Sequence, residues 1–187
     1  MNFELRPTAL PEVRLLVARR FHDARGFLSE VYGREAFREL GLDFDFVQEN
    51  HSYSERAGTV RGLHFQAPPR AQAKLVRVVR GAIYDVALDV RRGSPTFGRH
   101  VGVVLSAAEW NQLLVPVGFA HGFCTLEPDT EVIYKLTDSY APETERGVLW
   151  NDPALGIAWP VAPEAAIVSE KDRALPRLDE LEDRFVA

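Results

Sequence analysis

The segment VRGLHFQ, residues 60–66, combines the composition of a β-strand with two polar side chains that could do chemistry. Arg61 carries a guanidinium that suits phosphate or sugar oxygens, and His64 carries an imidazole that can take or give a proton near neutral pH. In a regular strand, residues three apart face opposite sides. We therefore predict a break in the pleating near Gly62, which would let the side chains of Arg61 and His64 point into the same cavity.

Further polar residues interrupt apolar strand-like runs elsewhere in the chain: Lys74, Asp85, His121 and Tyr134. Each has an ordinary structural explanation when taken singly. Lys74 would extend its ammonium to water, Asp85 would pair with an arginine, and Tyr134 would be a core aromatic. His64 and His121 would be hydrogen-bonded core histidines. In a small barrel, however, inward positions of neighbouring strands converge, and buried polar groups are costly unless they are paired or used. The number of such residues indicates a site.

The elements that would position these residues are mostly strands. Runs rich in β-branched and aromatic residues recur between turn signals, at 14–21, 27–32, 44–54, 59–66, 73–79, 82–90, 99–106, 112–117, 122–127 and 130–140. This spacing predicts an all-β sandwich or barrel, as a single domain over residues 1–187. A tight hairpin turn is expected at Arg80-Gly81. Two short helices are expected, at 34–40 and at 178–185, and the S-x-x-E capping box from Ser106 to Glu109 would start a single turn.

Composition excludes several classes of protein. The net charge of -5 gives no reason to expect nucleic-acid binding. The single cysteine, Cys124, cannot form an internal disulfide, which favours a reducing compartment. The N-terminal residues are charged where a signal peptide needs an apolar core, and no apolar run approaches membrane-spanning length. We therefore expect a cytoplasmic protein without a membrane partner.

Motifs for cofactors and metals are missing from the chain. It contains no GxGxxG after a strand, no Walker loop and no GxSxG elbow. It also contains no HxH, HExxH or CxxC, so we expect no metal site and no bound cofactor.

The chain resembles the dTDP-4-dehydrorhamnose 3,5-epimerase family over nearly its whole length. The likeness rests on the strings DARGFLSE, QENHSYSERAGTVRGLHFQ, QAKLVRVVRGAIYDVALDVR, SPTFG, VPVGFAHGF, YKLTDSYAPETERGVLWNDPALGIAWP and SEKD. It implies a cupin-like jelly roll and a homodimer with exchanged N-terminal strands. It also implies epimerisation of dTDP-4-keto-6-deoxy-D-glucose at C3 and C5 to dTDP-4-dehydro-L-rhamnose, in dTDP-L-rhamnose biosynthesis.

The same resemblance implies roles for individual residues. His64 would be the base that removes a proton next to the C4 ketone, and Asp172 would orient it. Lys74 would stabilise negative charge on the C4 oxygen, and Tyr134 would be the acid on the other face of the ring. The residues implied in substrate binding are Arg25, Glu30, Gln48, Asn50, Arg61, Asp85, His121 and Tyr140. The first two of these would reach the nucleotide from the neighbouring subunit.

Three other functions stay open at this point. An epimerase of the same family that inverts only C3, in an antibiotic-sugar pathway, can keep the same residues. A metal-dependent cupin would use His121 of PVGFAH, but LHFQ supplies one histidine where the first cupin motif needs two. A carbohydrate-binding jelly roll would have no use for a histidine–aspartate base. The apolar run RLLVARRF at 14–21 fits either an exchanged edge strand or a strand within the subunit.

Overall fold

The computed structural model describes residues 2–181 and 185. The strands are β1 (Phe3–Arg6), β2 (Arg14–Ala18), β3 (Phe21–Asp23), β4 (Gly26–Leu28), β5 (Gln48–Ser54), β6 (Thr59–Gln66), β7 (Lys74–Arg80), β8 (Ala82–Asp89), β9 (His100–Ser106), β10 (Asn111–Val115), β11 (Phe119–Thr125), β12 (Thr130–Leu136), β13 (Glu145–Gly147) and β14 (Ile167–Val168). The helices are α1 (Arg34–Glu39), α2 (Glu170–Arg173) and the 3₁₀ turns η1 (Pro142–Thr144) and η2 (Leu178–Glu180).

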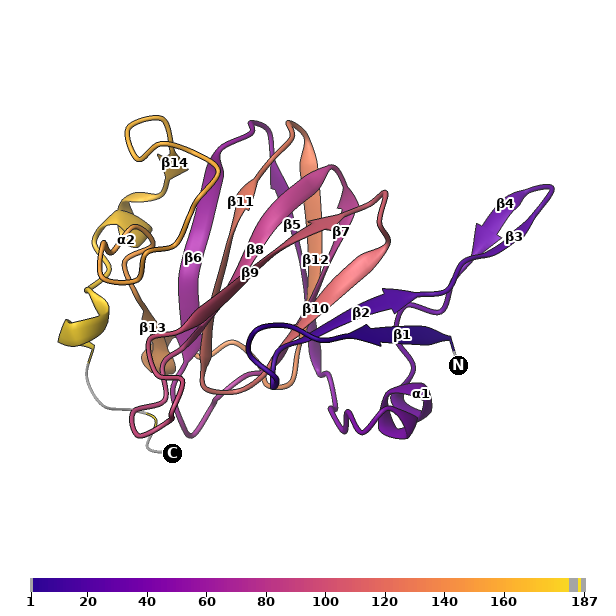
Figure 1. Cartoon of the computed structure of the whole chain (residues 1–187), viewed down its shortest axis with the longest axis horizontal. Helices are drawn as coiled ribbons and strands as arrows, with labels where there is room; N and C mark the ends of the chain where they lie inside the picture. Colours follow the sequence, from indigo (N-terminus) through magenta and orange to yellow (C-terminus); the bar gives the residue numbers. More distant parts are fainter. Residues whose placement is uncertain (1, 182–184, 186–187) are drawn as a thin grey trace.

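Two antiparallel sheets face each other and form a sandwich (Figure 1). The first has the order β1-β2-β10-β7-β12-β5, and the second has the order β13-β6-β11-β8-β9. Within this arrangement the eight consecutive strands β5 to β12 divide between the sheets, in the spatial orders β5-β12-β7-β10 and β6-β11-β8-β9. That order is the double Greek key of a jelly roll. The expectation of an all-β jelly roll with a few short helices is therefore confirmed.

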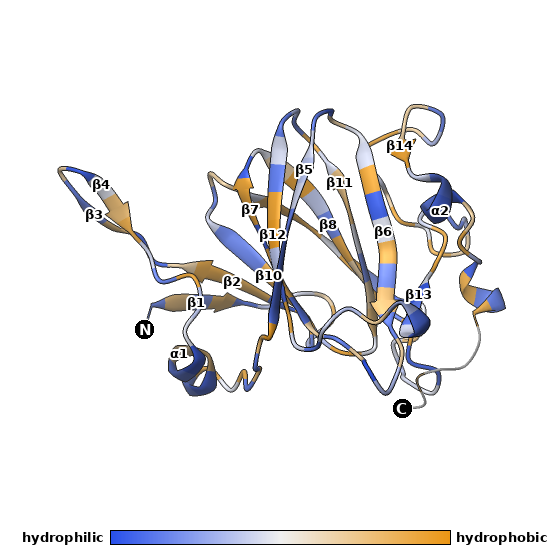
Figure 2. Cartoon of the chain, turned by 180° about the vertical axis from the view of Figure 1, so that it is seen from behind, coloured by the Kyte–Doolittle hydropathy of each residue, from blue (hydrophilic) through white to orange (hydrophobic). Residues whose placement is uncertain are grey.

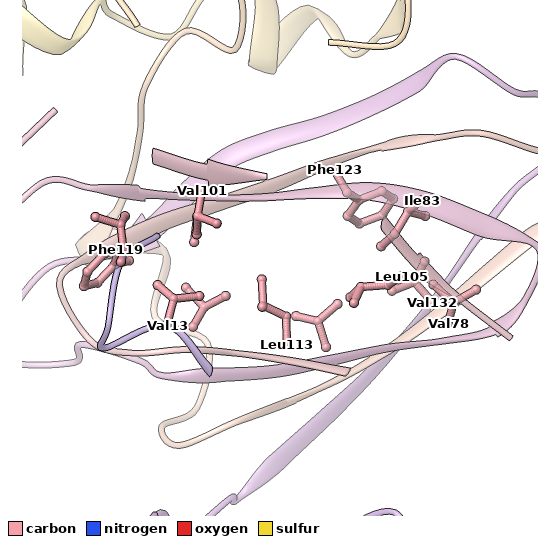
Figure 3. Packing of buried hydrophobic residues seen from close by; sticks show 13 residues of the cluster. Val13, Val78, Ile83, Val101, Leu105, Leu113, Phe119, Phe123 and Val132 are labelled. Carbon is pink, nitrogen blue, oxygen red and sulfur yellow. The ribbon is translucent and has the colours of Figure 1, made fainter. Parts of the chain in front are cut away.

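The core lies between the two sheets, because alternate residues of each strand point inward. Phe119, Phe123 and Ile83 from the second sheet meet Leu113 and Val132 from the first (Figure 3). Hydrophobic and hydrophilic residues also follow one another along β6 (Figure 2), where the apolar Leu63 and Phe65 pack into a separate cluster with Val86 and Leu88. Polar residues at inward positions are thus held between two rigid sheets, and this is what positions the site.

Most sequence-based expectations for single elements are confirmed. The strand runs from 44 onward each overlap a strand, although β11 begins at Phe119, three residues before the expected run, and helix α1 lies within 34–40. The hairpin turn at Arg80-Gly81 joins β7 to β8, with Gly81 at φ +77°. The Ser106 hydroxyl accepts a hydrogen bond from the Glu109 amide at 3.0 Å, and residues 107–110 form the expected single turn.

Other expectations for single elements were wrong or incomplete. The run 27–32 is a strand only to Leu28, and 178–185 begins with the 3₁₀ turn η2, while residues 182–184 lie outside the described residues. The elements β1, β13, β14 and α2 were not anticipated. Each is only two to four residues long, and β13 and β14 pair with the distant strand β6, so a local pattern does not indicate them.

The N-terminal segment divides into a paired part and a projecting part. β2 pairs with β1 on one side and β10 on the other, so Arg14–Ala18 is not an unpaired edge strand. The hairpin of β3 and β4 projects from the sandwich, at the end opposite α2 (Figures 1 and 2). In the described part of the chain, every helix is too short or too polar to cross a membrane.

Candidate active site

The strand β6 departs from regular pairing at Gly62, as the sequence predicts. Against β11, His64 lies opposite His121, whereas Arg61 lies opposite Phe123, so β6 has one more residue than its partner between these points. Gly62 has φ +120°, and a Cβ there would lie 2.5 Å from the Gly122 Cα. Only glycine fits both the conformation and this close approach. The extra residue lets Arg61 and His64 line the same cavity.

His64 is bonded to Asp172, which helix α2 places beside β6. The distance from His64 Nε2 to Asp172 Oδ1 is 2.7 Å, and Asp172 Oδ2 accepts a hydrogen bond from the Gly62 amide at 3.2 Å. Ser169 caps α2 by accepting a hydrogen bond from the Asp172 amide at 3.1 Å. Burial alone would raise the pKa of Asp172, but its bonds to His64 and Gly62 outweigh this and hold the pKa below the ordinary 3.8. The carboxylate is therefore ionised and accepts the Nε2 proton, which leaves Nδ1 of His64 as the basic nitrogen.

Two adjoining cavities meet at three side chains. A cavity of about 510 Å³, the large cavity, contains Arg61, His121 and Asp172 in its wall, and its volume is typical of small-molecule sites. A cavity of about 170 Å³, the small cavity, contains Asn50 and Tyr140. The side chains common to both walls are His64, Lys74 and Tyr134. A sugar ring at this junction would touch all three.

Lys74 is a buried cation, and the expectation that it extends to water was wrong. Its side chain starts at the first residue of β7, only 8% of the residue is exposed, and Nζ donates to the His64 carbonyl oxygen at 3.0 Å. Burial lowers the pKa of Lys74 from 10.5 to about 8, and the charges of Asp85 and Glu145 limit the decrease. An ammonium in such a site interacts strongly with any negative charge that develops beside it.

Asp85 and His121 form a second buried histidine–aspartate pair. His121 Nε2 lies 2.6 Å from Asp85 Oδ1, and the two residues are 6% and 0% exposed. The expectation that Asp85 pairs with an arginine was therefore wrong. His121 lines the large cavity, whereas Asp85 lies behind it.

Tyr134 approaches the junction from the first sheet. It lies opposite Val76 of β7 and Asn50 of β5, and it packs against the core between the sheets. The simple reading of a core aromatic is incomplete, because the side chain also lines both cavities.

Hydrogen bonds join several side chains around the small cavity. Gln48 donates to Asn50 Oδ1 at 2.9 Å and accepts from the Tyr140 amide at 2.8 Å, although Gln48 itself lines neither cavity. Glu145 accepts from the Tyr140 hydroxyl at 2.8 Å and from Lys171 at 2.6 Å. Sequence reasoning missed Glu145 and Lys171, since their separation of 26 residues makes their pairing a product of the fold.

Arg25 and Glu30 do not reach this site within the chain. Arg25 lies at the tip of the projecting β3–β4 hairpin, with a side chain that is 90% exposed and paired only with Asp23 among the described residues. Glu30 accepts a hydrogen bond from Asn2 at 2.6 Å. Neither residue lines the large or the small cavity.

Metal-binding side chains are not gathered at the site. Across residues 2–181 and 185, no three His, Cys, Asp or Glu side chains are grouped to hold a metal ion. His121, the residue that a metal cupin would use, is bonded to Asp85 instead.

Comparisons with known proteins give one consistent family. A family model described as dTDP-4-dehydrorhamnose 3,5-epimerase matches residues 7–180. The protein of that name from Sinorhizobium fredii is 51% identical over 177 residues, which are 95% of this chain and 90% of that protein. The Bacillus anthracis enzyme, solved with TDP and PPi bound, has a TM-score of 0.90 at 51% identity, over 94% of this chain and 99% of that one. The Legionella pneumophila enzyme, solved in complex with dTDP-4-keto-L-rhamnose, has a TM-score of 0.91 at 40% identity, over 96% of this chain and 95% of that one.

Proposed function

The chain belongs to the dTDP-4-dehydrorhamnose 3,5-epimerase family, and from this premise we propose that it inverts C3 and C5 of dTDP-4-keto-6-deoxy-D-glucose around His64, Lys74 and Tyr134. The product is dTDP-4-dehydro-L-rhamnose. The observation that carries the proposal is the junction of the two cavities, where these three side chains from both sheets meet and Asp172 holds the first of them. The names of the relatives support the double inversion over the C3-only alternative.

Proton removal begins at His64. The ketone at C4 acidifies the hydrogens on C3 and C5, so a general base can remove them. Because Nε2 donates its proton to Asp172, Nδ1 is the nitrogen that takes the proton from carbon. Asp172 then stabilises the imidazolium that forms. The electron pair of the broken C–H bond moves onto the C4 oxygen as an enolate.

Lys74 stabilises that enolate. Its ammonium is already desolvated and held in place by the His64 carbonyl oxygen, so little reorganisation is needed when negative charge develops. The same cation would attract the ground-state ketone only weakly, because a neutral carbonyl carries less charge. The stabilisation is therefore greater in the transition state than in the bound substrate.

Tyr134 returns a proton to the opposite face of the ring. A phenol stays protonated at neutral pH, so it can deliver a proton to the enolate carbon. His64 comes from the second sheet and Tyr134 from the first, so the two groups approach a ring at the junction from different sides.

Replacing Tyr134 by phenylalanine is expected to separate exchange from inversion. His64 can still remove a proton, exchange it with solvent and return it to the same face. In deuterium oxide the recovered substrate should gain label, whereas formation of the inverted sugar should fall by about 10²-fold or more. Proton NMR of the substrate and product signals measures both rates. A Tyr53→Phe variant is the control, since Tyr53 is exposed on β5 and bonded to Asp129. An equal loss of exchange and inversion would contradict the role of Tyr134.

Solvent exchange in the unmodified enzyme tests the function itself. The protein is incubated with dTDP-4-keto-6-deoxy-D-glucose in deuterium oxide, and C3 and C5 are followed by NMR. We expect deuterium at both carbons of the product. Label at C3 alone would identify a C3-only epimerase. The absence of label from folded protein would favour a carbohydrate-binding module, and stoichiometric iron, zinc or manganese in the purified protein would favour a metal cupin.

We also propose that the enzyme works as a homodimer in which the β3–β4 hairpin crosses to the partner. The hairpin projects and exposes the apolar residues Phe27 and Leu28 together with Arg25. Crossing would bring Arg25 and Glu30 to the nucleotide of the neighbouring subunit. Residues 1–187 are proposed to act as one domain, because both sheets contribute to the site. The cytoplasm stays a prediction, with which the buried Cys124 agrees.

A further inference from the structure

Asp85 is a fully buried carboxylate that the reaction above does not use. It lies in the middle of β8 and is 0% exposed. Its Oδ1 is bonded to His121, but its Oδ2 has no hydrogen-bond partner among the described residues. No lysine or arginine in that part of the chain is bonded to it. Burial of an ionised carboxylate is costly unless a positive charge lies near.

Lys74 is connected to Asp85 through His64 and His121. Its Nζ is bonded to the His64 carbonyl oxygen, His64 lies opposite His121 in the β6–β11 pairing, and His121 is bonded to Asp85. The ammonium comes from the first sheet and the carboxylate from the second, and Lys74 is 8% exposed and Asp85 0%. Charges in such a dry setting interact over longer distances than they do at a surface.

Several groups surround Lys74, and they are not equivalent. The titratable and charged groups that share the walls of its two cavities come from β6, β11, β12, the segment after β12, β13 and α2, and they are Arg61, His64, His121, Tyr134, Tyr140, Glu145, Lys171 and Asp172. Asp85 on β8 lies behind His121, outside both cavity walls, and its charge acts on Lys74 from there. Of the two carboxylates whose charges raise the pKa of Lys74, Glu145 is already paired with Lys171 and bonded to Tyr140. Asp85 has no such cation of its own, so its charge is the one available to Lys74.

We propose that Asp85 is a positioning residue for the epimerisation, whose buried charge keeps the Lys74 ammonium protonated in the cavity. The inference rests on the proposed role of Lys74 at the C4 oxygen. Burial lowers the pKa of Lys74 to about 8, and the charge of Asp85 opposes this decrease. Without that charge the pKa would fall further, and a neutral amine at physiological pH would stabilise an enolate far less.

The lysine count makes a direct test possible. The chain has three lysines, Lys74, Lys135 and Lys171, so protein labelled with ¹³Cε-lysine gives three NMR signals to follow against pH. Lys135 and Lys171 are paired with Glu49 and Glu145. In the Asp85→Asn variant we expect the titration midpoint of Lys74 to fall by on the order of one pH unit. The alkaline limb of kcat/KM should move by the same amount, since it reports groups of the free enzyme.

Asp89→Asn is the matched control, because Asp89 is equally buried on the same strand but is bonded to Arg91, away from the site. It should leave the Lys74 midpoint unchanged. Asp85→Ser removes the same charge with a smaller side chain and serves if Asp85→Asn does not fold. An unchanged Lys74 midpoint in the neutral Asp85 variants would overturn the charge coupling. A midpoint that moves while the alkaline limb stays would instead overturn the proposed role of Lys74.

Discussion

In the His64→Asn variant, we expect kcat to fall by about 10²–10⁴-fold, the usual contribution of a general base. Asparagine can keep a hydrogen bond to Asp172 through its amide, so the local geometry should survive. It has no basic nitrogen, so it cannot take the proton from C3 or C5. Initial rates of deuterium entry at the two carbons measure the loss without interference from later steps.

Two measurements separate lost chemistry from lost structure in His64→Asn. The affinity for dTDP and the thermal midpoint should stay near those of the unmodified enzyme, because His64 lies in a cavity wall with 29% of its side chain exposed. His51→Asn is the matched histidine control, since His51 is exposed on β5 and bonded to Glu131. Deuterium entry in His64→Asn at the unmodified rate would mean that another group is the base.

The Lys74→Met variant is expected to lose activity and gain stability. Loss of a buried donor to an oxyanion lowers kcat by about 10²–10³-fold. Holding the ammonium in the folded protein is unfavourable, because its pKa falls from 10.5 to about 8 on burial. Each pH unit between the pKa values of the unfolded and folded states is worth about 1.36 kcal/mol. At pH 7 the free energy of unfolding of the variant should therefore exceed that of the unmodified protein by on the order of 3 kcal/mol. The thermal midpoint should rise by about 2–4 °C for each kcal/mol.

The gain in stability should depend on pH in a defined direction. The loss of stability caused by the buried ammonium is fully present below pH 8, where Lys74 is protonated in both the folded protein and the unfolded chain. It declines from pH 8 to 10.5, because the folded protein has lost the proton that the unfolded chain still binds. Urea denaturation at pH 7 and pH 10 measures the difference. Lys135→Met, which removes a lysine paired with Glu49, should give no such gain. A Lys74→Met variant that is less stable than the unmodified protein at pH 7 would contradict the buried-charge argument.

The strand pattern and the break at Gly62 could be read from the sequence because both depend on neighbouring residues. Alternation along each run sets the face that is buried, and a glycine between Arg61 and His64 permits the conformation that turns both inward. The resemblance added the identities of the catalytic candidates. None of this required knowledge of which strands pair.

Contacts between distant segments were decided only by the tertiary structure. Asp172 meets His64 from 108 residues away, and Glu145 meets Lys171 because β13 and α2 both pack beside β6. The ordinary alternatives for single residues, with Lys74 reaching water and Asp85 paired with an arginine, do not hold, since a strand position alone does not tell how much protein the facing sheet places over it. The sequence determined the residue types and the local geometry of the strands. The packing of two sheets against each other determined which charges lose water, and that loss sets their chemistry.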